Sequence, residues 1–431
     1  MEKTLILASG KCSWSKCYAC GWGKLEAPVD IGKLKARVES TSFLGVTKLK
    51  VFASGSFLDD AQFPRAFRQW FAEYIRQSRV KELVIESRPE YITKASLSDF
   101  RDINLTVAIG LECADDRVLK KYRKGFNVAQ WLKAVKLLRK NRVSIRTYVM
   151  VNIPFGNAKA LEKTVKLAIR ESDSVVLINT FPHAKASLFD LWVIGRWKPL
   201  DKGQFEAIVS HWAKNKKIEV DYQNYAFVPK IPKERQEFIR GVGIACLDHS
   251  HYNVWQDYFV RFYEKPIDKD IALFLPCSFR KPYAGSRTHV EIYEAIKEAK
   301  VFPRLHRIVL SSPGVIPFEF SDYYPFNSYD WPEWLETAKV KKDYIRFVKA
   351  RVKEYLKTHK YKRYLCYFKY SAETYIALKE ACKELELPLT NLLDEKVYEK
   401  IKDERNPIIT KIALSCLKKK LKYINIYIYS L

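Results

Sequence analysis

Short apolar runs alternate with amphipathic stretches along the first half of the chain. Between most of these runs, apolar residues recur at helical spacing, as in Phe67–Gln77, Val128–Lys140 and Leu161–Glu171. The alternation predicts a parallel sheet with helical crossovers, built either as an open sheet or as a full or partial barrel. The runs of strand length are Leu5–Ala8, Lys48–Ala53, Glu82–Glu86, Leu105–Gly110, Ile145–Val151, Val175–Asn179 and Ile218–Asp221.

A second pattern of strands and helices begins near Pro266 and predicts a smaller α/β domain. Ser312–Trp334, rich in Pro, Tyr and Phe, is expected to be an ordered loop. We therefore divide the chain into a first domain at 1–265, the smaller domain at 266–400, and a basic, then Ile/Tyr-rich tail at 401–431. The predicted strands are Ile271–Leu275, Arg307–Ser311 and Tyr364–Phe368, and the predicted helices are His289–Ala299, Lys341–His359 and Ala372–Leu385.

The chain is strongly basic, and its positive charge is spread over both predicted domains. Its 431 residues carry a formal net charge of +27. Such a field favours a polyanionic partner, with an ion-paired surface as the alternative. No signal-peptide pattern is seen, and no apolar stretch approaches the roughly 20 residues that span a bilayer. The sequence therefore predicts a cytoplasmic protein that binds nucleic acid and no membrane.

Three of the nine cysteines form one compact motif. Cys12, Cys17 and Cys20 have the spacing C-x4-C-x2-C and directly follow the first predicted strand, where barrels place their chemistry. Three thiolates on one loop can bind three irons of a cubane and leave the fourth iron open. A zinc site would need a fourth ligand, and no Cys or His lies between Cys20 and Cys113. The motif therefore favours a [4Fe–4S] cluster over zinc.

This spacing resembles the Elp3-like branch of the radical S-adenosylmethionine (SAM) enzymes. The resemblance implies a partial (β/α) barrel in which the open iron chelates SAM, whose reductive cleavage gives a radical that abstracts hydrogen. Segments after the second, third and fourth strands, and a later basic residue, resemble the SAM-contacting positions of that superfamily. These candidate cofactor-binding residues are Ser54, Gly55, Ser56, Glu86, Arg88, Glu112 and Arg123. The structural alternative for Glu86 and Arg88 is a surface ion pair, which their position at the C-terminal end of a predicted strand disfavours.

A closer resemblance, over roughly residues 1–260, is to the radical SAM subunit of archaeosine synthase. It rests on Val51–Asp59, Ile85–Glu90 and Ala108–Glu112, which occur in order with compatible spacing. The resemblance implies a tRNA substrate with a lysine-conjugated 7-deazaguanine at position 15. It also implies cleavage of the lysyl C–N bond of this lysine–preQ0 adduct.

A second motif, at residues 276–289, reads P-C-x3-K-P-Y-x2-S-x2-H. A cysteine beside basic groups is a candidate nucleophile, while a buried thiol, a Pro-Tyr turn and a serine N-cap form the structural alternative. The motif resembles the signature of the other archaeosine synthase subunit over residues 270–395, which attaches free lysine to the nitrile of preQ0 in tRNA. The candidate catalytic residues are Cys277, Lys281, Tyr283, Ser286 and His289.

Two further features carry weaker signals. Cys246, His249 and His251 could contribute to a metal site, or be ordinary polar residues near a domain junction. The helix predicted at Lys341–His359 has a basic face that could contact phosphates or simply be solvated.

Taken with both resemblances, the sequence predicts a radical SAM enzyme of archaeosine biosynthesis, of C–N lyase type, with a domain for lysine transfer or adduct binding. Its expected cofactors are a [4Fe–4S] cluster and SAM. Its expected partners are tRNA and free lysine, with a separate archaeosine synthase or transglycosylase subunit as a further candidate. The alternatives are another Elp3-like radical SAM enzyme acting on tRNA or a small molecule, and a non-catalytic zinc- and RNA-binding protein.

Overall fold

The computed structural model describes residues 1–53, 55–222 and 228–424, and the chain divides into two compact units. The first is Met1–Phe227 and the second Val228–Leu431. The boundary lies earlier than the 265/266 junction that the sequence predicts. The reason is helix α10 (Ser250–Arg261), whose Gln256 exchanges two hydrogen bonds with the backbone of Val315 in the second unit.

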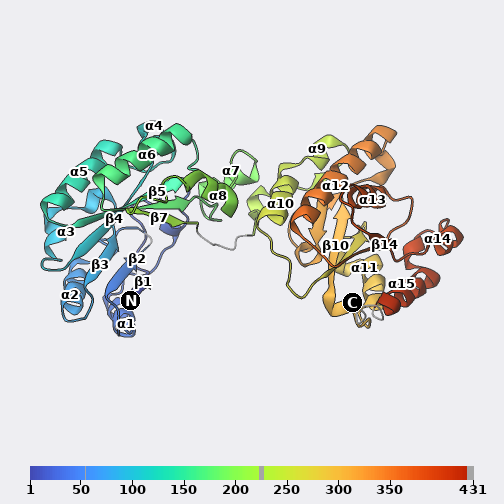
Figure 1. Ribbon diagram of the computed structural model, residues 1–431, viewed down its shortest axis with the longest axis horizontal. Helices are drawn as coiled ribbons and strands as arrows, with labels where there is room; N and C mark the ends of the chain where they lie inside the picture. Colours follow the sequence, from blue (N-terminus) through green and yellow to red (C-terminus); the bar gives the residue numbers. More distant parts are fainter. Residues whose placement is uncertain (54, 223–227, 425–431) are drawn as a thin grey trace. The chain divides into compact units, whose positions relative to one another are not determined.

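The described part of the first unit contains a seven-stranded parallel sheet whose strands pair in chain order (Figure 1). Each strand from β1 to β6 is followed by a crossover that brings the chain back to the same end of the sheet, which is the arrangement of a partial (β/α) barrel. The sequence-based prediction of this fold is confirmed. The strands are β1 (Glu2–Ile6), β2 (Lys48–Phe52), β3 (Glu82–Glu86), β4 (Leu105–Glu112), β5 (Ser144–Val151), β6 (Ser174–Asn179) and β7 (Ile218–Asp221).

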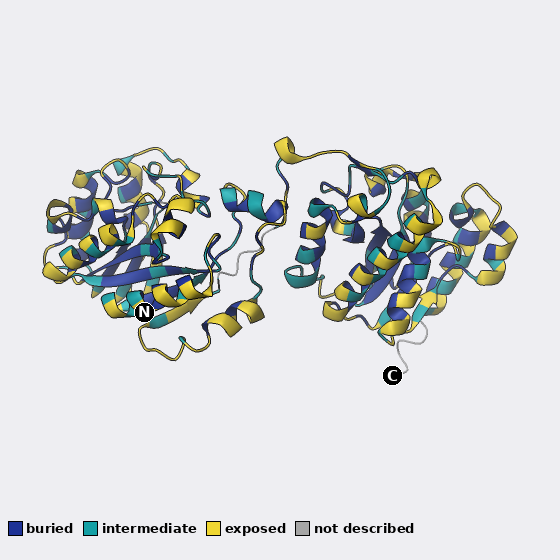
Figure 2. Cartoon of the chain, turned by 90° about the horizontal axis from the view of Figure 1, so that it is seen from above, coloured by how far each residue is buried: buried dark blue, intermediate teal, exposed yellow. Residues whose placement is uncertain are grey.

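Helices cover this sheet, and all but α2 and α7 begin at polar caps. Asn127 accepts the backbone N–H of Gln130, whose side chain accepts that of Asn127 in return, so this capping box fixes the start of α5. The buried face of α5 then packs on the sheet interior, shown dark blue in Figure 2. The helices are α1 (Ile31–Glu39), α2 (Arg65–Arg76), α3 (Lys94–Ser98), α4 (Asp116–Lys121), α5 (Val128–Lys140), α6 (Ala158–Glu171), α7 (Ser187–Val193) and α8 (Lys202–Val209).

The second unit is built on a five-stranded sheet with the order β11-β10-β9-β13-β14 in its described residues. All neighbours are parallel except β10 and β11. Because the chain moves from β9 first to one side and later to the other, ligands are expected at the carboxyl ends near β9 and β13. The strands are β9 (Ile271–Pro276), β10 (Leu305–Ser311), β11 (Gly314–Pro317), β13 (Arg363–Cys366) and β14 (Leu389–Asn391).

Two segments of the second unit differ from the sequence-based expectation. The region 312–334 is not only loop, because it contains β11 and also β12 (Tyr329–Asp330), which pairs with β8 (Ile239–Arg240). The region 401–424 is no loose tail, because α15 (Lys411–Ile424) buries one apolar face in the core. The remaining helices are α9 (Ile244–Leu247), α11 (Arg287–Ile296), α12 (Ala338–Thr358), α13 (Glu373–Glu384) and α14 (Glu395–Ile401).

Candidate functional site

The cysteine loop, defined here as residues 12–20, follows β1 and is held by backbone hydrogen bonds on both sides. The Tyr18 N–H donates to the Tyr122 carbonyl at 2.9 Å, and the Leu188 N–H donates to the Tyr18 carbonyl at 3.0 Å. Trp14 lies against Gly125, where an added Cβ would stand 2.4 Å from the indole. Gly125 also has a φ of +84°, which favours glycine. The loop is therefore positioned by the segment that follows α4.

The three cysteines of the loop are free thiols, and backbone amides point at two of them. The Gly23 N–H donates to Cys20 Sγ at 3.3 Å, and the Ser15 N–H approaches Cys12 Sγ at 3.5 Å. A Cβ added at Gly23 would contact the sulfurs of both Cys12 and Cys20, so these two thiols face one space. Amide donors to thiolate sulfur are typical of iron–sulfur sites, so the donor set fits a cluster.

Two buried cations lie beside the cysteine loop, each paired with an acid. The Arg88 guanidinium binds Glu90 at 2.5 Å and approaches Cys17 Sγ at 3.9 Å. Lys124 Nζ lies 2.5 Å from Glu112 Oε1. Burial raises the pKa of Cys17, while the positive charges of Lys124 and Arg88 oppose that shift. These cations would stabilise negative charge on the thiolates or on an anionic group bound next to them.

The predicted SAM-contacting residues of β2 and β3 meet at the carboxyl ends of those strands. Ser56 donates its backbone N–H to the Gln62 side chain at 2.9 Å, and Gly55 leaves room for that same side chain. The Glu86 carboxylate accepts the Ala53 N–H at 3.4 Å. Burial raises the pKa of Glu86 to about 7. Ser54 lies outside the described residues.

Arg123 and its neighbour Lys124 take different environments. Arg123 is exposed, has a φ of +57°, and lies with its guanidinium 5.9 Å from the centre of the Tyr18 ring. Lys124 is 8% exposed and faces Glu112 at the end of β4. Arg123 was a candidate from the sequence, whereas Lys124 was not. The sequence shows two adjacent cations, but the turn after α4 decides which of the two side chains is buried.

The motif at 276–289 places a thiol and an amine at the carboxyl end of β9. Cys277 follows this strand, and Ser311 ends the neighbouring β10 and hydrogen-bonds Cys277. Lys281 Nζ lies 3.9 Å from the centre of the Tyr329 ring. The Tyr283 hydroxyl bonds that of Tyr329, which in turn donates to Ser311 Oγ at 2.5 Å. Cys277, Lys281 and Tyr283 thus form one cluster, named here the thiol–amine cluster, with Ser311 and Tyr329.

Burial in the thiol–amine cluster favours the uncharged form of the Cys277 thiol and of the Lys281 amine. Burial raises the pKa of Cys277, with opposition from the Ser311 hydrogen bond and the charge of Lys281. Burial likewise lowers the pKa of Lys281. Ser311 and Tyr329 were not among the sequence-based candidates, since they lie in β10 and in a segment expected to be loop.

Ser286 and His289 make contacts of a different kind. The Ser286 side chain accepts the His289 N–H at 3.3 Å and caps α11. The His289 ring is 3% exposed, and its Nε2 donates to the Pro276 carbonyl at 3.0 Å. The described contacts therefore give Ser286 and His289 a role in shaping the turn between β9 and α11, and their part in catalysis stays a prediction.

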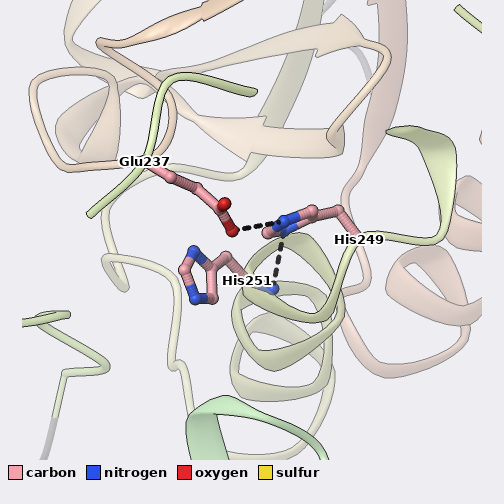
Figure 3. A group of neighbouring side chains, drawn as sticks. All are labelled: Glu237, His249 and His251. Carbon is pink, nitrogen blue, oxygen red and sulfur yellow. Dashed lines mark hydrogen bonds and ion pairs between the residues drawn. The ribbon is translucent and has the colours of Figure 1, made fainter. Parts of the chain in front are cut away.

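Cys246 does not join the two histidines that follow it. Its Sγ lies 3.8 Å from the Arg240 carbonyl oxygen, whereas His249 and His251 group with Glu237 (Figure 3). Glu237 was not a candidate from the sequence, because it lies twelve residues before His249 and no fixed spacing links them.

The basic face of α12 is partly neutralised by the neighbouring helix. Lys349 Nζ lies 2.9 Å from Glu380 and 3.1 Å from Glu384, both on α13. Lys353 pairs with Glu384, and Lys341 pairs with Glu373 at 2.8 Å. These ion pairs account for several of the cations that the sequence presents as a phosphate-contacting or solvated face.

No helix among the described residues is long and apolar enough to cross a bilayer.

Two family models match the chain. Residues 11–168 match the radical SAM superfamily, and residues 253–403 match a domain of unknown function, DUF5591. The first match contains the cysteine loop and the second contains the thiol–amine cluster.

Several curated relatives resemble this chain over about half of its length. The alpha subunit of archaeosine synthase from Thermoplasma acidophilum is 26% identical over 242 residues, or 52% of this chain and 44% of the relative. The beta subunit from Methanosarcina acetivorans is 26% identical over 215 residues, or 46% and 62%. The chain spans about half the length of the curated relatives it matches.

Among solved structures, the archaeal Elp3 of Methanocaldococcus infernus aligns with a TM-score of 0.38 and 16% identity, covering 51% of this chain and 56% of that one. The cofactors of a radical SAM domain are a [4Fe–4S] cluster and SAM, as expected from the sequence. The chain therefore carries a match to the radical SAM superfamily in its first unit and a match to DUF5591 in its second.

Proposed function

We propose that this protein is a tRNA-modifying radical SAM enzyme of archaeosine biosynthesis. The observation that carries the proposal is the presence on one chain of the cysteine loop and the thiol–amine cluster, in regions matching two different domain families. Curated relatives named as the alpha and the beta subunit of archaeosine synthase both resemble this chain. Two sites that serve consecutive steps of one modification would explain the fusion.

In the first unit, Cys12, Cys17 and Cys20 are the proposed cluster ligands, and their free thiols fit that role. When bound, the cluster and SAM supply the carbon-centred radical that abstracts hydrogen from the substrate. Arg88 and Lys124 hold positive charge beside this space, where they would attract the carboxylate of SAM.

The strand ends of the first unit supply the proposed polar contacts to SAM. Ser56, Glu86 and Glu112 come from the carboxyl ends of β2, β3 and β4, which lie side by side in the sheet. A Glu86 carboxyl with a pKa of about 7 can exchange a proton near neutral pH. The reaction proposed for this unit is cleavage of the lysyl C–N bond in a lysine–preQ0 adduct of tRNA.

In the second unit, Cys277 and Lys281 are proposed to act on the nitrile that accepts free lysine. Burial lowers the pKa of Lys281, which favours an amine that takes the proton of the Cys277 thiol as sulfur adds to the nitrile carbon and passes it to the nitrile nitrogen. The amine of free lysine would then displace the Cys277 thiol and leave the adduct on the tRNA. Tyr283, Ser311 and Tyr329 would hold the polar end of the substrate through their linked hydroxyls.

The charge of the chain is consistent with an RNA substrate. A net charge of +27 favours binding of a polyanion and predicts a strong salt dependence. A separate archaeosine synthase or transglycosylase subunit is a candidate partner, because the relatives named as alpha and beta subunits are separate chains.

The direct test is the substrate dependence of SAM cleavage. Anaerobically reconstituted protein would be given SAM, reductant and either adduct-bearing tRNA or the same tRNA without the adduct. The proposal predicts cleavage coupled to loss of the lysyl chain, and only with the adduct. Cleavage that responds equally to both tRNAs would instead support an Elp3-like radical SAM enzyme with another substrate. Stoichiometric zinc in place of iron and sulfide would support the zinc- and RNA-binding alternative.

A further inference from the structure

Three metal-ligating side chains, none of them part of the thiol–amine cluster, converge in the second unit. Glu237 lies in the segment that leads into β8, while His249 caps α10 and His251 stands in its first turn (Figure 3). One ligand atom from each lies within 4.8 Å of the other two. The Glu237 side chain is 62% exposed and that of His249 is 20% exposed, so a solvated ion can reach the group.

The Tyr324 hydroxyl helps to hold the ring of His251 in place. This hydroxyl accepts the Glu237 N–H at 3.0 Å and donates to the Glu237 carbonyl at 2.9 Å. His251 Nδ1 lies 2.9 Å from the same hydroxyl oxygen. Tyr324 therefore links the backbone of Glu237 to the His251 ring, and outer hydrogen bonds of this kind orient the histidine ligands of metals.

His249 and Glu237 contribute the other two ligand atoms. His249 Nδ1 accepts the His251 N–H at 3.2 Å, and its Nε2 donates to Glu237 Oε1 at 2.9 Å. The proton between His249 and Glu237 occupies the place where a cation would bind. A metal ion replaces it there when the imidazole proton moves from Nε2 to Nδ1, at the expense of the long hydrogen bond to the His251 amide.

We propose that Glu237, His249 and His251 form a binding site for a divalent transition-metal ion of the zinc class. Two imidazole nitrogens and one carboxylate oxygen are the donor types that such ions prefer, and three protein ligands leave a position for water. Tyr324 is the positioning residue for His251. The ion would fasten the segment before β8 to the start of α10, a structural role that is independent of the proposed radical chemistry.

The test counts zinc in the intact, cluster-loaded protein. After treatment with a mild chelator, the protein would be equilibrated with Zn²⁺, desalted anaerobically and analysed for zinc and iron together. The expected result is one zinc per chain beyond the cluster iron, and a rise in melting temperature on adding Zn²⁺. Glu237→Gln keeps a hydrogen-bond acceptor for His249 but is a poor ligand, so it should bind zinc at least tenfold more weakly.

His251→Gln should lose the zinc as well, and circular dichroism would confirm that it folds. The matched control is His211→Gln, an exposed histidine of the first unit, which should keep wild-type zinc content. The proposal is overturned if the wild-type protein retains no zinc, or if Glu237→Gln retains as much as the wild type. Both outcomes are read from zinc content, whereas the proposed archaeosine activity is read from the modified tRNA, so failure of this proposal is distinguishable from failure of the proposed function.

Discussion

The cysteine loop and the thiol–amine cluster use the same residue type in opposite electrostatic settings. Beside the loop, buried charge occurs as pairs, with Arg88 bound to Glu90 and Lys124 bound to Glu112. In the thiol–amine cluster, burial acts on Cys277 and Lys281 in opposite directions and favours the uncharged form of each.

The difference in electrostatic setting is the one expected between thiolates that bind iron and a thiol that acts as a nucleophile. Thiolates that bind iron need nearby cations, because negative charge on sulfur must be stabilised in a buried site. A thiol that adds to an electrophile needs a group that takes its proton at the moment of reaction. The following variants test whether the two settings serve these separate purposes.

The largest expected effect is the loss of the cluster in Cys17→Ala. Two thiols would remain, which is too few to hold three irons. Iron and sulfide content, the visible absorption of the cluster and SAM cleavage should all fall to background. Cys382→Ala, which changes a buried cysteine of α13, is the control and should keep all three. SAM cleavage that persists in Cys17→Ala would refute the ligand assignment.

Cys277→Ala and Lys281→Met should separate the two activities. Formation of the lysine adduct on preQ0-containing tRNA is expected to fall by about 100-fold or more, because proton transfer or nucleophilic attack is removed. SAM cleavage on preformed adduct-tRNA should stay within about twofold of wild type, since no radical-site residue changes. Both reactions can be followed by mass spectrometry of tRNA digests. If both activities survive, the motif is structural.

The next effect concerns the charge pairs beside the loop. Lys124→Gln leaves the largely buried Glu112 carboxylate without its cation and should lower the free energy of unfolding by about 3 kcal/mol. The double variant Lys124→Gln/Glu112→Gln removes both charges and should recover most of this loss. Urea denaturation of the cluster-free proteins measures both. A double variant as unstable as the single one would show that the ion pair is not the cause.

Glu86 gives the smallest effect, a pH dependence. Its pKa is raised from 4.5 to about 7 by burial, so the folded protein binds this proton more tightly than the unfolded chain. The free energy of unfolding should therefore fall as pH rises from about 4.5 to about 7. For a partly exposed group the fall is on the order of 2 kcal/mol. In Glu86→Gln, the free energy of unfolding measured by urea denaturation should therefore differ less between about pH 5 and about pH 7.5 than in the wild type. An unchanged difference would contradict the assignment of this pH dependence to Glu86.

Much of the fold follows from local patterns in the sequence. The bounds of β3, β7 and α5 match the predicted ones, because a continuous apolar run marks β3, alternating apolar and acidic residues mark β7, and a polar cap marks the start of α5. The short edge strands β11 and β12 were missed, since their few residues form strands only through pairing with β10 and β8. In α15, Ala413, Leu417 and Leu421 recur every four residues, a signal of helix that the surrounding lysines obscured.

The residues of the candidate sites could be predicted only in part, because some of them meet through tertiary contacts and not through local spacing. Cysteine spacing within nine residues identifies a loop that can hold a cluster, because the ligands are local. Partners such as Lys124 for Glu112, or Glu237 for His249, are twelve residues apart and meet only through the turns between elements. Such pairings depend on the tertiary fold and leave no fixed spacing in the sequence.

The central claim is that one chain serves two consecutive steps of archaeosine formation. The most direct test is anaerobic nucleoside mass spectrometry of preQ0-containing tRNA incubated with cluster-loaded protein, lysine, SAM and reductant. If the proposed function is right, archaeosine forms and is preceded by the lysine adduct, and the adduct alone accumulates in Cys17→Ala. Failure to convert supplied adduct-tRNA, with an intact cluster and SAM present, would contradict the proposed function.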